Sequence, residues 1–106
     1  MTLKYPIAGI ATSNNNAGQF IADRVNFIGS NFMGQVQAPD HNPNDFRTYG
    51  YLDVNNIALL NKDEPSYIVY SYATPIAWFG KLGWVLPAVK YSPTTSKHQS
   101  IVRRAI

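Results

Sequence analysis

The sequence of 106 residues contains no cysteine, which excludes structural disulfides, thiolate nucleophiles and thiolate metal sites. Only two histidines are present, His41 and His98, so a metal site would need carboxylates as its other ligands. No apolar run approaches the roughly 20 residues of a membrane-spanning helix. Pro6 and Gly9 also interrupt the apolar N-terminus before it reaches the length of a signal sequence. We therefore expect a cytoplasmic protein that holds no metal and no cofactor.

Acidic side chains are absent after Pro65. All six acids precede this proline, so residues 1–64 carry 4 − 6 = −2 charges, whereas residues 65–106 carry +5. Such an asymmetry permits a basic face that attracts phosphates or an acidic protein. The alternative is that folding brings carboxylates beside these bases and cancels the patch.

Apolar and aromatic residues, by contrast, are plentiful, at 45% and 13% of the chain. At this length they can fill the core of one domain without disulfides. The stretch Tyr67–Gln99 holds both tryptophans and four of the seven tyrosines, and we expect the rest of the chain to cover it. We predict a single α+β domain over residues 1–106, with an antiparallel sheet, a short N-terminal helix and a C-terminal helix.

The first half of the chain gives weaker signals. Gln19–Ile28 has helical spacing and a glycine after it, which favours a helix ended by Gly29, although Val25 and Phe27 alternate as in a strand. Phe46–Val54 alternates as a strand does. The remaining expectations are an edge strand or arm over 2–12, a short strand over 35–37, a loop over 38–45, a hairpin turn at 55–56 and a returning strand over 57–60.

The second half gives stronger signals. Ser66–Tyr72 is rich in β-branched and aromatic residues and predicts the central strand. Thr74 and Pro75 are expected to bend the chain before further strands at Ile76–Phe79 and Trp84–Leu86. The following Ser92-Pro93 is a helix start, because serine can cap free amides and proline is tolerated in the first turn. The predicted C-terminal helix covers 93–104, with Thr94, His98, Ile101, Val102 and Ala105 on its apolar side.

No catalytic constellation is recognisable in the sequence. His41 lies in the turn-like PDHNPND segment, which lacks the periodic acidic ligands and central glycine of a calcium-binding loop. The sequence has no nucleophile elbow, and no neighbour in the sequence would orient His98 as a base. A half-buried, hydrogen-bonded structural histidine is the expected role of His98. We therefore assign no catalytic residue.

Two groups of residues are candidates for binding. Arg47, Tyr49 and Tyr51 would share one face of the strand over 46–54, where they could stack on bases or simply form a covered sheet face. On the C-terminal helix, cations could contact phosphates while hydroxyls and an amide add hydrogen bonds; these residues are Lys97, Arg103, Arg104, Thr94, Thr95 and Gln99. The alternative for this helix is a solvated basic surface that only caps the fold.

Three motifs, SNFMGQ, YSYATPIAWF and KYSPTTSKHQS, carry a resemblance that spans roughly residues 30–100. The chain resembles a family of short uncharacterised proteins encoded by phages, prophages and plasmids of Gram-positive bacteria. The resemblance implies a mobile-element origin, action in the host cytoplasm and a compact fold. It implies no activity.

The sequence thus supports two hypotheses of different classes. The first is a non-enzymatic module that binds nucleic acid or a nucleic-acid-handling complex, as a monomer or a homodimer. The alternative is an inhibitor or adaptor that binds a host protein, for example a defence component such as a CRISPR effector, through its aromatic surface and the loop over 38–46.

Overall fold

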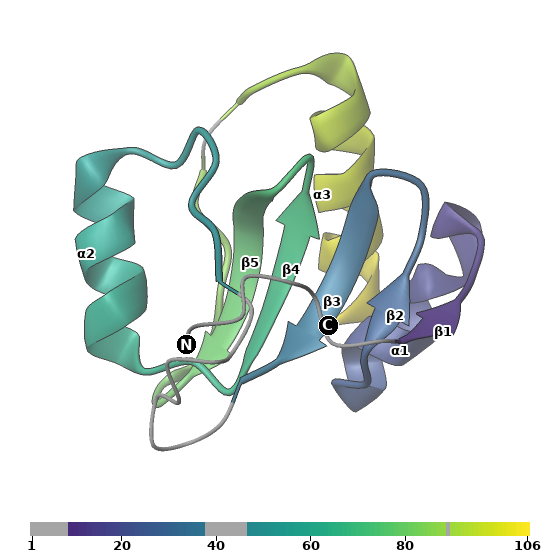
Figure 1. The fold of residues 1–106 in the computed structure, drawn as a ribbon, viewed down its shortest axis with the longest axis horizontal. Coiled ribbons are helices and arrows are strands. Elements are labelled where there is room, and N and C mark those ends of the chain that lie inside the picture. The colour runs from purple at the N-terminus through teal and green to yellow at the C-terminus, as the bar shows by residue number, and fades with distance from the viewer. Residues whose placement is uncertain (1–8, 38–46, 89) are drawn as a thin grey trace, which may run out of the picture.

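The computed structural model describes residues 9–37, 47–88 and 90–106. In these ranges one six-stranded sheet is accompanied by three α-helices and a 3-10 turn, which confirms the predicted α+β fold (Figure 1). The strands follow one another in the sheet in chain order, and every neighbouring pair is antiparallel except β1 and β2. The elements are β1 (Ile10–Ala11), η1 (Asn14–Asn16), α1 (Ala17–Asp23), β2 (Phe27–Ile28), β3 (Phe32–Val36), α2 (Val54–Asp63), β4 (Tyr67–Ser71), β5 (Thr74–Gly80), β6 (Gly83–Val85) and α3 (Pro93–Ala105).

Strand β4 is the centre of the molecule, as predicted. All five of its residues are buried, and it pairs with β3 on one side and β5 on the other. The predicted bend at Thr74-Pro75 is wrong, because both residues belong to β5 and the chain reverses one step earlier, at Tyr72-Ala73. A shift of register between Val69 and Tyr70 leaves an irregularity opposite Pro75, which is the kind of place where a sheet tolerates proline.

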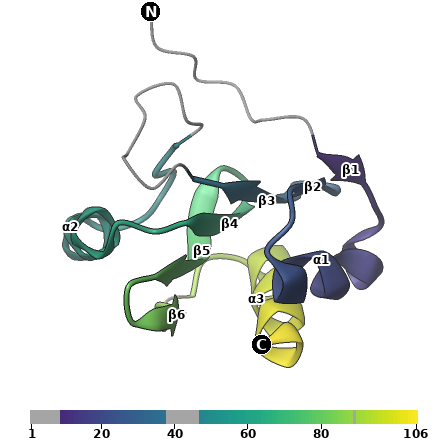
Figure 2. The same ribbon diagram turned by 90° about the horizontal axis from the view of Figure 1, so that it is seen from below.

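The two faces of the sheet carry separate cores. On one face α1 and α3 lie side by side, and their apolar residues pack with Phe27, Phe32 and Tyr67 (Figure 2). On the other face Leu60 of α2 packs with Trp78 and the neighbouring side chains of β4. Within the described ranges, no helix has the length and apolar character needed to cross a bilayer.

Helix α2 replaces the hairpin that was predicted between residues 46 and 60. The described part of the predicted strand, from Arg47 onward, contains no strand, and the supposed turn at 55–56 is the first turn of a helix. Asp53 is the reason: its carboxylate accepts a hydrogen bond from the Asn56 amide at 3.2 Å and caps α2. Ile57 and Leu60 then face the sheet at helical spacing.

The N-terminal helix is shorter than predicted. It ends at Asp23, because Arg24 turns into the left-handed region with φ of 53°, so Gly29 does not end it. Phe27 and Ile28 form β2 instead, which agrees with the alternative pattern of the sequence. The short strand expected at 35–37 exists but covers Phe32–Val36. Of the edge strand or arm predicted over 2–12, residues 9–12 are described and contain β1. The loop predicted over 38–45 lies outside the described residues.

Helix α3 begins as predicted. The Ser92 hydroxyl accepts a hydrogen bond from the Thr95 amide at 3.2 Å, and Pro93 follows in the first turn. The predicted division of its faces is partly wrong, since Thr95 and Gln99 are buried while Thr94 is exposed. Thr95 therefore points into the protein, beneath the end of the β4–β5 hairpin.

Candidate functional site

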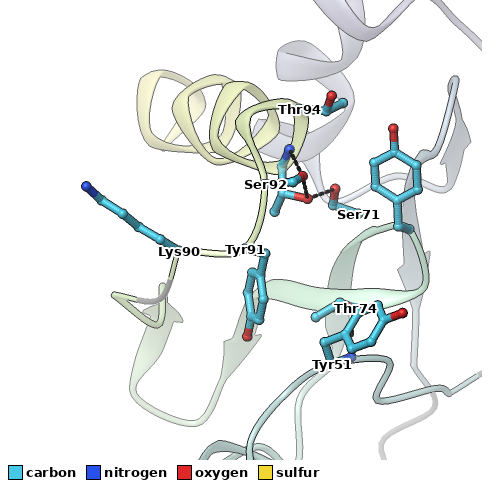
Figure 3. Close-up of a pocket in the computed structure, with 9 residues that line it drawn as sticks. Tyr51, Ser71, Thr74, Lys90, Tyr91, Ser92 and Thr94 are labelled. Atoms are coloured by element: carbon cyan, nitrogen blue, oxygen red, sulfur yellow. Dashed lines mark hydrogen bonds between the residues drawn. The ribbon is translucent and has the colours of Figure 1, made fainter.

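A pocket of about 650 Å³ opens beside the N-terminus of α3. Three separate parts of the chain build it: the segment before α2, the β4–β5 turn and the approach to α3 (Figure 3). None of the described residues that line it is acidic. They are Tyr51, Ser71, Tyr72, Thr74, Lys90, Tyr91, Ser92, Thr94 and Thr95.

Tyr72 reaches this pocket from a strained turn. Tyr72 and Ala73 are the two central residues between β4 and β5, and both have positive φ, of 50° and 65°. Two-residue turns of this kind favour Asn-Gly, and other L-residues occupy the left-handed region at a cost of about 1–2 kcal/mol each. The turn nevertheless places a bulky, half-exposed aromatic ring there.

Tyr51 is held beside the same turn by its backbone. Its amide donates a hydrogen bond to the Thr74 hydroxyl at 2.9 Å. The preceding Gly50 has φ of 50°, and a side chain there would overlap that hydroxyl. The ring of Tyr51 remains 82% exposed. The backbone of Tyr51 is therefore held in place beside the pocket, while its ring remains almost fully in solvent.

Under the pocket lies a buried network of hydroxyls and one imidazole. Ser71 Oγ is 2.7 Å from His98 Nδ1 and 3.0 Å from Thr95 Oγ1, and all three residues are almost completely buried. The His98 ring stacks on Phe32 with ring centroids 4.4 Å apart. The expected hydrogen-bonded histidine is confirmed, and it is more deeply buried than the sequence indicated.

Asn14 determines the tautomer of His98. Its Oδ1 accepts from the Ser30 amide and its Nδ2 donates to the Ser30 carbonyl, which fixes the orientation of the side-chain amide. The same Nδ2 lies 3.3 Å from His98 Nε2, so Nε2 is the acceptor and the ring proton sits on Nδ1. His98 therefore donates to Ser71 Oγ. In this arrangement it holds Ser71 in place and cannot accept the proton of that hydroxyl as a general base would.

Burial lowers the pKa of His98 below its ordinary value of 6.5, because desolvation disfavours the imidazolium. The unfolded chain therefore binds more protons than the folded protein below about pH 6.5. We expect the free energy of unfolding to fall as the pH drops from about 6.5 toward 5, by at most about 1.4 kcal/mol per pH unit for one proton. Urea unfolding across this range measures the slope. His98→Gln should flatten it, and an equal slope in wild type and variant would contradict this account.

The exposed face of α3 carries the predicted cations. Lys97, Arg103 and Arg104 are all exposed, and none forms an ion pair with a described residue. They border a groove of about 530 Å³ together with Asn15, Ser100 and Ile101. The acids Asp40 and Asp45 lie outside the described residues; the described carboxylates do not neutralise this face.

Of the residues predicted on a stacking strip, Arg47 and Tyr49 lie together against α2, whereas Tyr51 lies at the pocket. The Arg47 guanidinium donates to Gln37 Oε1 at 3.0 Å and to Asn61 Oδ1 at 3.3 Å, and the Tyr49 hydroxyl donates to the same Asn61 oxygen at 3.0 Å. Both side chains thus serve to fix α2 against the segment before it. Only Tyr51 of this group reaches the pocket, so the hypothesis of a strip on one strand face is wrong.

The other predicted residues divide among three places. Thr94 and Thr95 line the pocket, Gln99 is buried in α3, and the three cations lie on its outer face. Sequence reasoning missed Lys90, Tyr91, Ser92, Ser71, Thr74 and Tyr72 as pocket residues. The available signal was the position of Tyr-Ala at the end of the strongest strand, where a tight turn ordinarily has Asn or Gly.

A sequence profile for a family of unknown function, DUF8033, matches residues 15–102. This range runs from η1 almost to the end of α3 and includes every described residue of the pocket. Of the three cations on the basic face it includes Lys97, whereas Arg103 and Arg104 follow it. No significant match was found among curated proteins or among solved structures.

Proposed function

The chain belongs to the DUF8033 family, and we propose that it is a non-enzymatic module that binds nucleic acid through the exposed face of α3. One observation carries the proposal: Lys97, Arg103 and Arg104 lie together on one exposed surface with no carboxylate partner among the described residues. Unpaired cations in a shallow groove attract phosphates and release condensed counterions when these bind. From the resemblance of its motifs to those of phage and plasmid proteins, we also propose that the module belongs to a mobile genetic element.

The spacing of the cations suits a polyanion better than a single phosphate. Lys97 and Arg104 are seven positions apart, which corresponds to about 10.5 Å along the helix axis. Between them, an Arg103 Nη2–Ser100 Oγ hydrogen bond of 3.2 Å holds one guanidinium close to the helix. Asn15, from the neighbouring η1, adds an amide to the same groove. Several phosphates along one strand could therefore be contacted at once.

We expect weak, strongly salt-dependent binding. Three phosphate contacts to a single strand predict a slope of log K against log salt of about −2. Replacing Lys97 and Arg104 with glutamine should lower the affinity at low salt and reduce the magnitude of the slope by about 1.4. Fluorescence anisotropy with single- and double-stranded DNA and RNA across a salt series measures both quantities.

The matched control is Lys62→Gln with Lys81→Gln, which removes two charges from the α2 side of the molecule. This control should keep the slope. No binding at low salt, or equal losses in the two double variants, would contradict the proposal. A host protein would then become the preferred partner, bound through exposed apolar side chains such as Tyr51 and Val54, which are 82% and 77% exposed.

A further inference from the structure

We propose that the pocket at the N-terminus of α3 binds one unpaired nucleotide, with its base against Tyr51 and Tyr72 and its phosphate toward Lys90. If the nucleotide belongs to an oligonucleotide, the inference rests on the proposed function and adds a binding site for one base to it. A free mononucleotide offers the same chemistry, and the experiment below separates the two sources.

The walls of the pocket suit a flat aromatic ligand. Its volume of about 650 Å³ lies within the range of about 300–1,000 Å³ that is usual for small-molecule sites. Three tyrosine rings form part of the lining, and two of them, Tyr51 and Tyr72, are exposed to solvent. A base stacked on these rings would remove apolar surface from water without needing a particular base edge. The site therefore fits any unpaired base.

The charge around the pocket suits a phosphate. No acidic residue is among the described residues that line it, and its one charged residue is Lys90. The ammonium of Lys90 points outward, away from the other labelled lining residues, so its charge lies outside the space for the base (Figure 3). The hydroxyl of Thr94 adds a hydrogen-bonding group on the α3 side, whereas that of Ser92 already donates to Thr95 Oγ1 and accepts from the Thr95 amide. A ligand with a planar apolar part and an adjacent negative charge matches this arrangement.

The pocket shares a lining residue with a groove that borders the basic face of α3. Lys90 lines both the pocket and this second groove, of about 450 Å³, which Arg103 borders as well. Arg103 in turn borders the groove that contains Lys97 and Arg104. From Thr94 to Arg103 the helix rises about 14 Å, a distance that a few nucleotides of a single strand can span. A strand with one base in the pocket could therefore place its next phosphates along these cations.

A paired base cannot enter such a pocket without leaving its duplex, and unstacking it costs free energy. The inference therefore predicts a preference for single strands over duplexes. The basic face alone would not produce this preference, because phosphates are present in both.

Two pocket variants and one control test the inference. Tyr51→Ser removes a ring that is almost fully exposed. Tyr72→Asn removes the second ring and replaces it with a residue that tolerates the positive φ of the turn. Each should weaken binding of an oligothymidylate of about eight nucleotides by about tenfold, without changing the salt slope, because no charge is lost. Ala73→Gly is the control, since it relaxes the same turn and keeps Tyr72; its affinity should equal that of wild type.

The outcomes separate this inference from the proposed function. Unchanged affinity in both tyrosine variants overturns the pocket site, even if loss of the α3 cations still weakens binding. Loss of affinity in Ala73→Gly equal to that in Tyr72→Asn also overturns it, because the turn and not the ring would then be responsible. A third outcome is that wild type binds thymidine monophosphate but not the oligonucleotide, and that the tyrosine variants bind the monophosphate about tenfold more weakly. The pocket would then be a site for free nucleotides, and the proposed function would fail. If neither probe binds the wild type at low salt, both proposals fail.

Discussion

Replacing Trp78 with alanine is expected to lower the free energy of unfolding by about 3–5 kcal/mol. Trp78 is fully buried on the α2 face of the sheet, where it packs with Leu60, Ile68 and Tyr70. Removing the indole would leave a large cavity between the sheet and α2. The side chains around it are held by the sheet and cannot move far enough to fill it. The loss should therefore weaken the attachment of α2 as well as the core.

Trp84→Ala is the matched comparison for this prediction. Trp84 is only half-buried, at the edge of the sheet, where its ring meets Phe79 and Tyr67 edge to face. Its truncation removes less buried surface and should cost less than that of Trp78. Urea unfolding of both variants gives the two losses. If Trp84→Ala proved the more damaging, or if neither changed stability, the core would lie elsewhere.

Gly34→Ala has the second largest expected effect, a loss of about 2–4 kcal/mol. Gly34 lies in β3 between β2 and β4, and a methyl group there would overlap the Tyr67 hydroxyl and the edge of the Phe27 ring. The Tyr67 hydroxyl passes this point to donate a hydrogen bond to the Val25 carbonyl at 2.8 Å. The added methyl group would displace the ring and break that bond in a closed core.

A double-mutant cycle with Tyr67→Phe tests this cause. Removing the hydroxyl also removes its overlap with the new methyl group, although the Phe27 contact remains. The combined variant should therefore be more stable than the sum of the two single losses predicts. Additive losses would show that Gly34 does not make room for Tyr67.

The parts of the fold that the sequence predicted well are those specified by local patterns. Strand β4 is an apolar β-branched and aromatic run, and α3 begins at a serine cap followed by proline. Both signals are contained within a few residues. The burial of His98 also followed from its place among the apolar residues of the helix.

Helix α2 could not be recognised in the same way. The alternation of 46–54 is typical of a strand, and the run after it contains two asparagines that favour a turn. What decides the structure is the Asp53 cap together with the packing of Leu60 on Trp78, 18 positions later in the sequence. Tertiary contacts of this kind override local propensity and are not visible in a single window of sequence.

In the candidate site, too, some features follow from local sequence and others only from the fold. The cations of α3 lie on one short helix whose periodicity relates their positions, so their exposure on its outer side was predictable. The tyrosines of the pocket come from positions 51, 72 and 91, and only the fold brings them together. Tyr51 was singled out for stacking, but as part of a strand that the described residues 47–54 do not form.

We propose that a single strand of nucleic acid lies along α3 with one base in the pocket formed by Tyr51, Tyr72 and Tyr91. A titration of ¹⁵N-labelled protein with oligothymidylate at low salt, followed by NMR, shows which residues the strand contacts. We predict shifts concentrated at Tyr51, Tyr72, Lys90 and the outer face of α3, with α2 unaffected. Shifts confined to α2 and the far edge of the sheet, or no shifts at millimolar oligonucleotide, would contradict the claim.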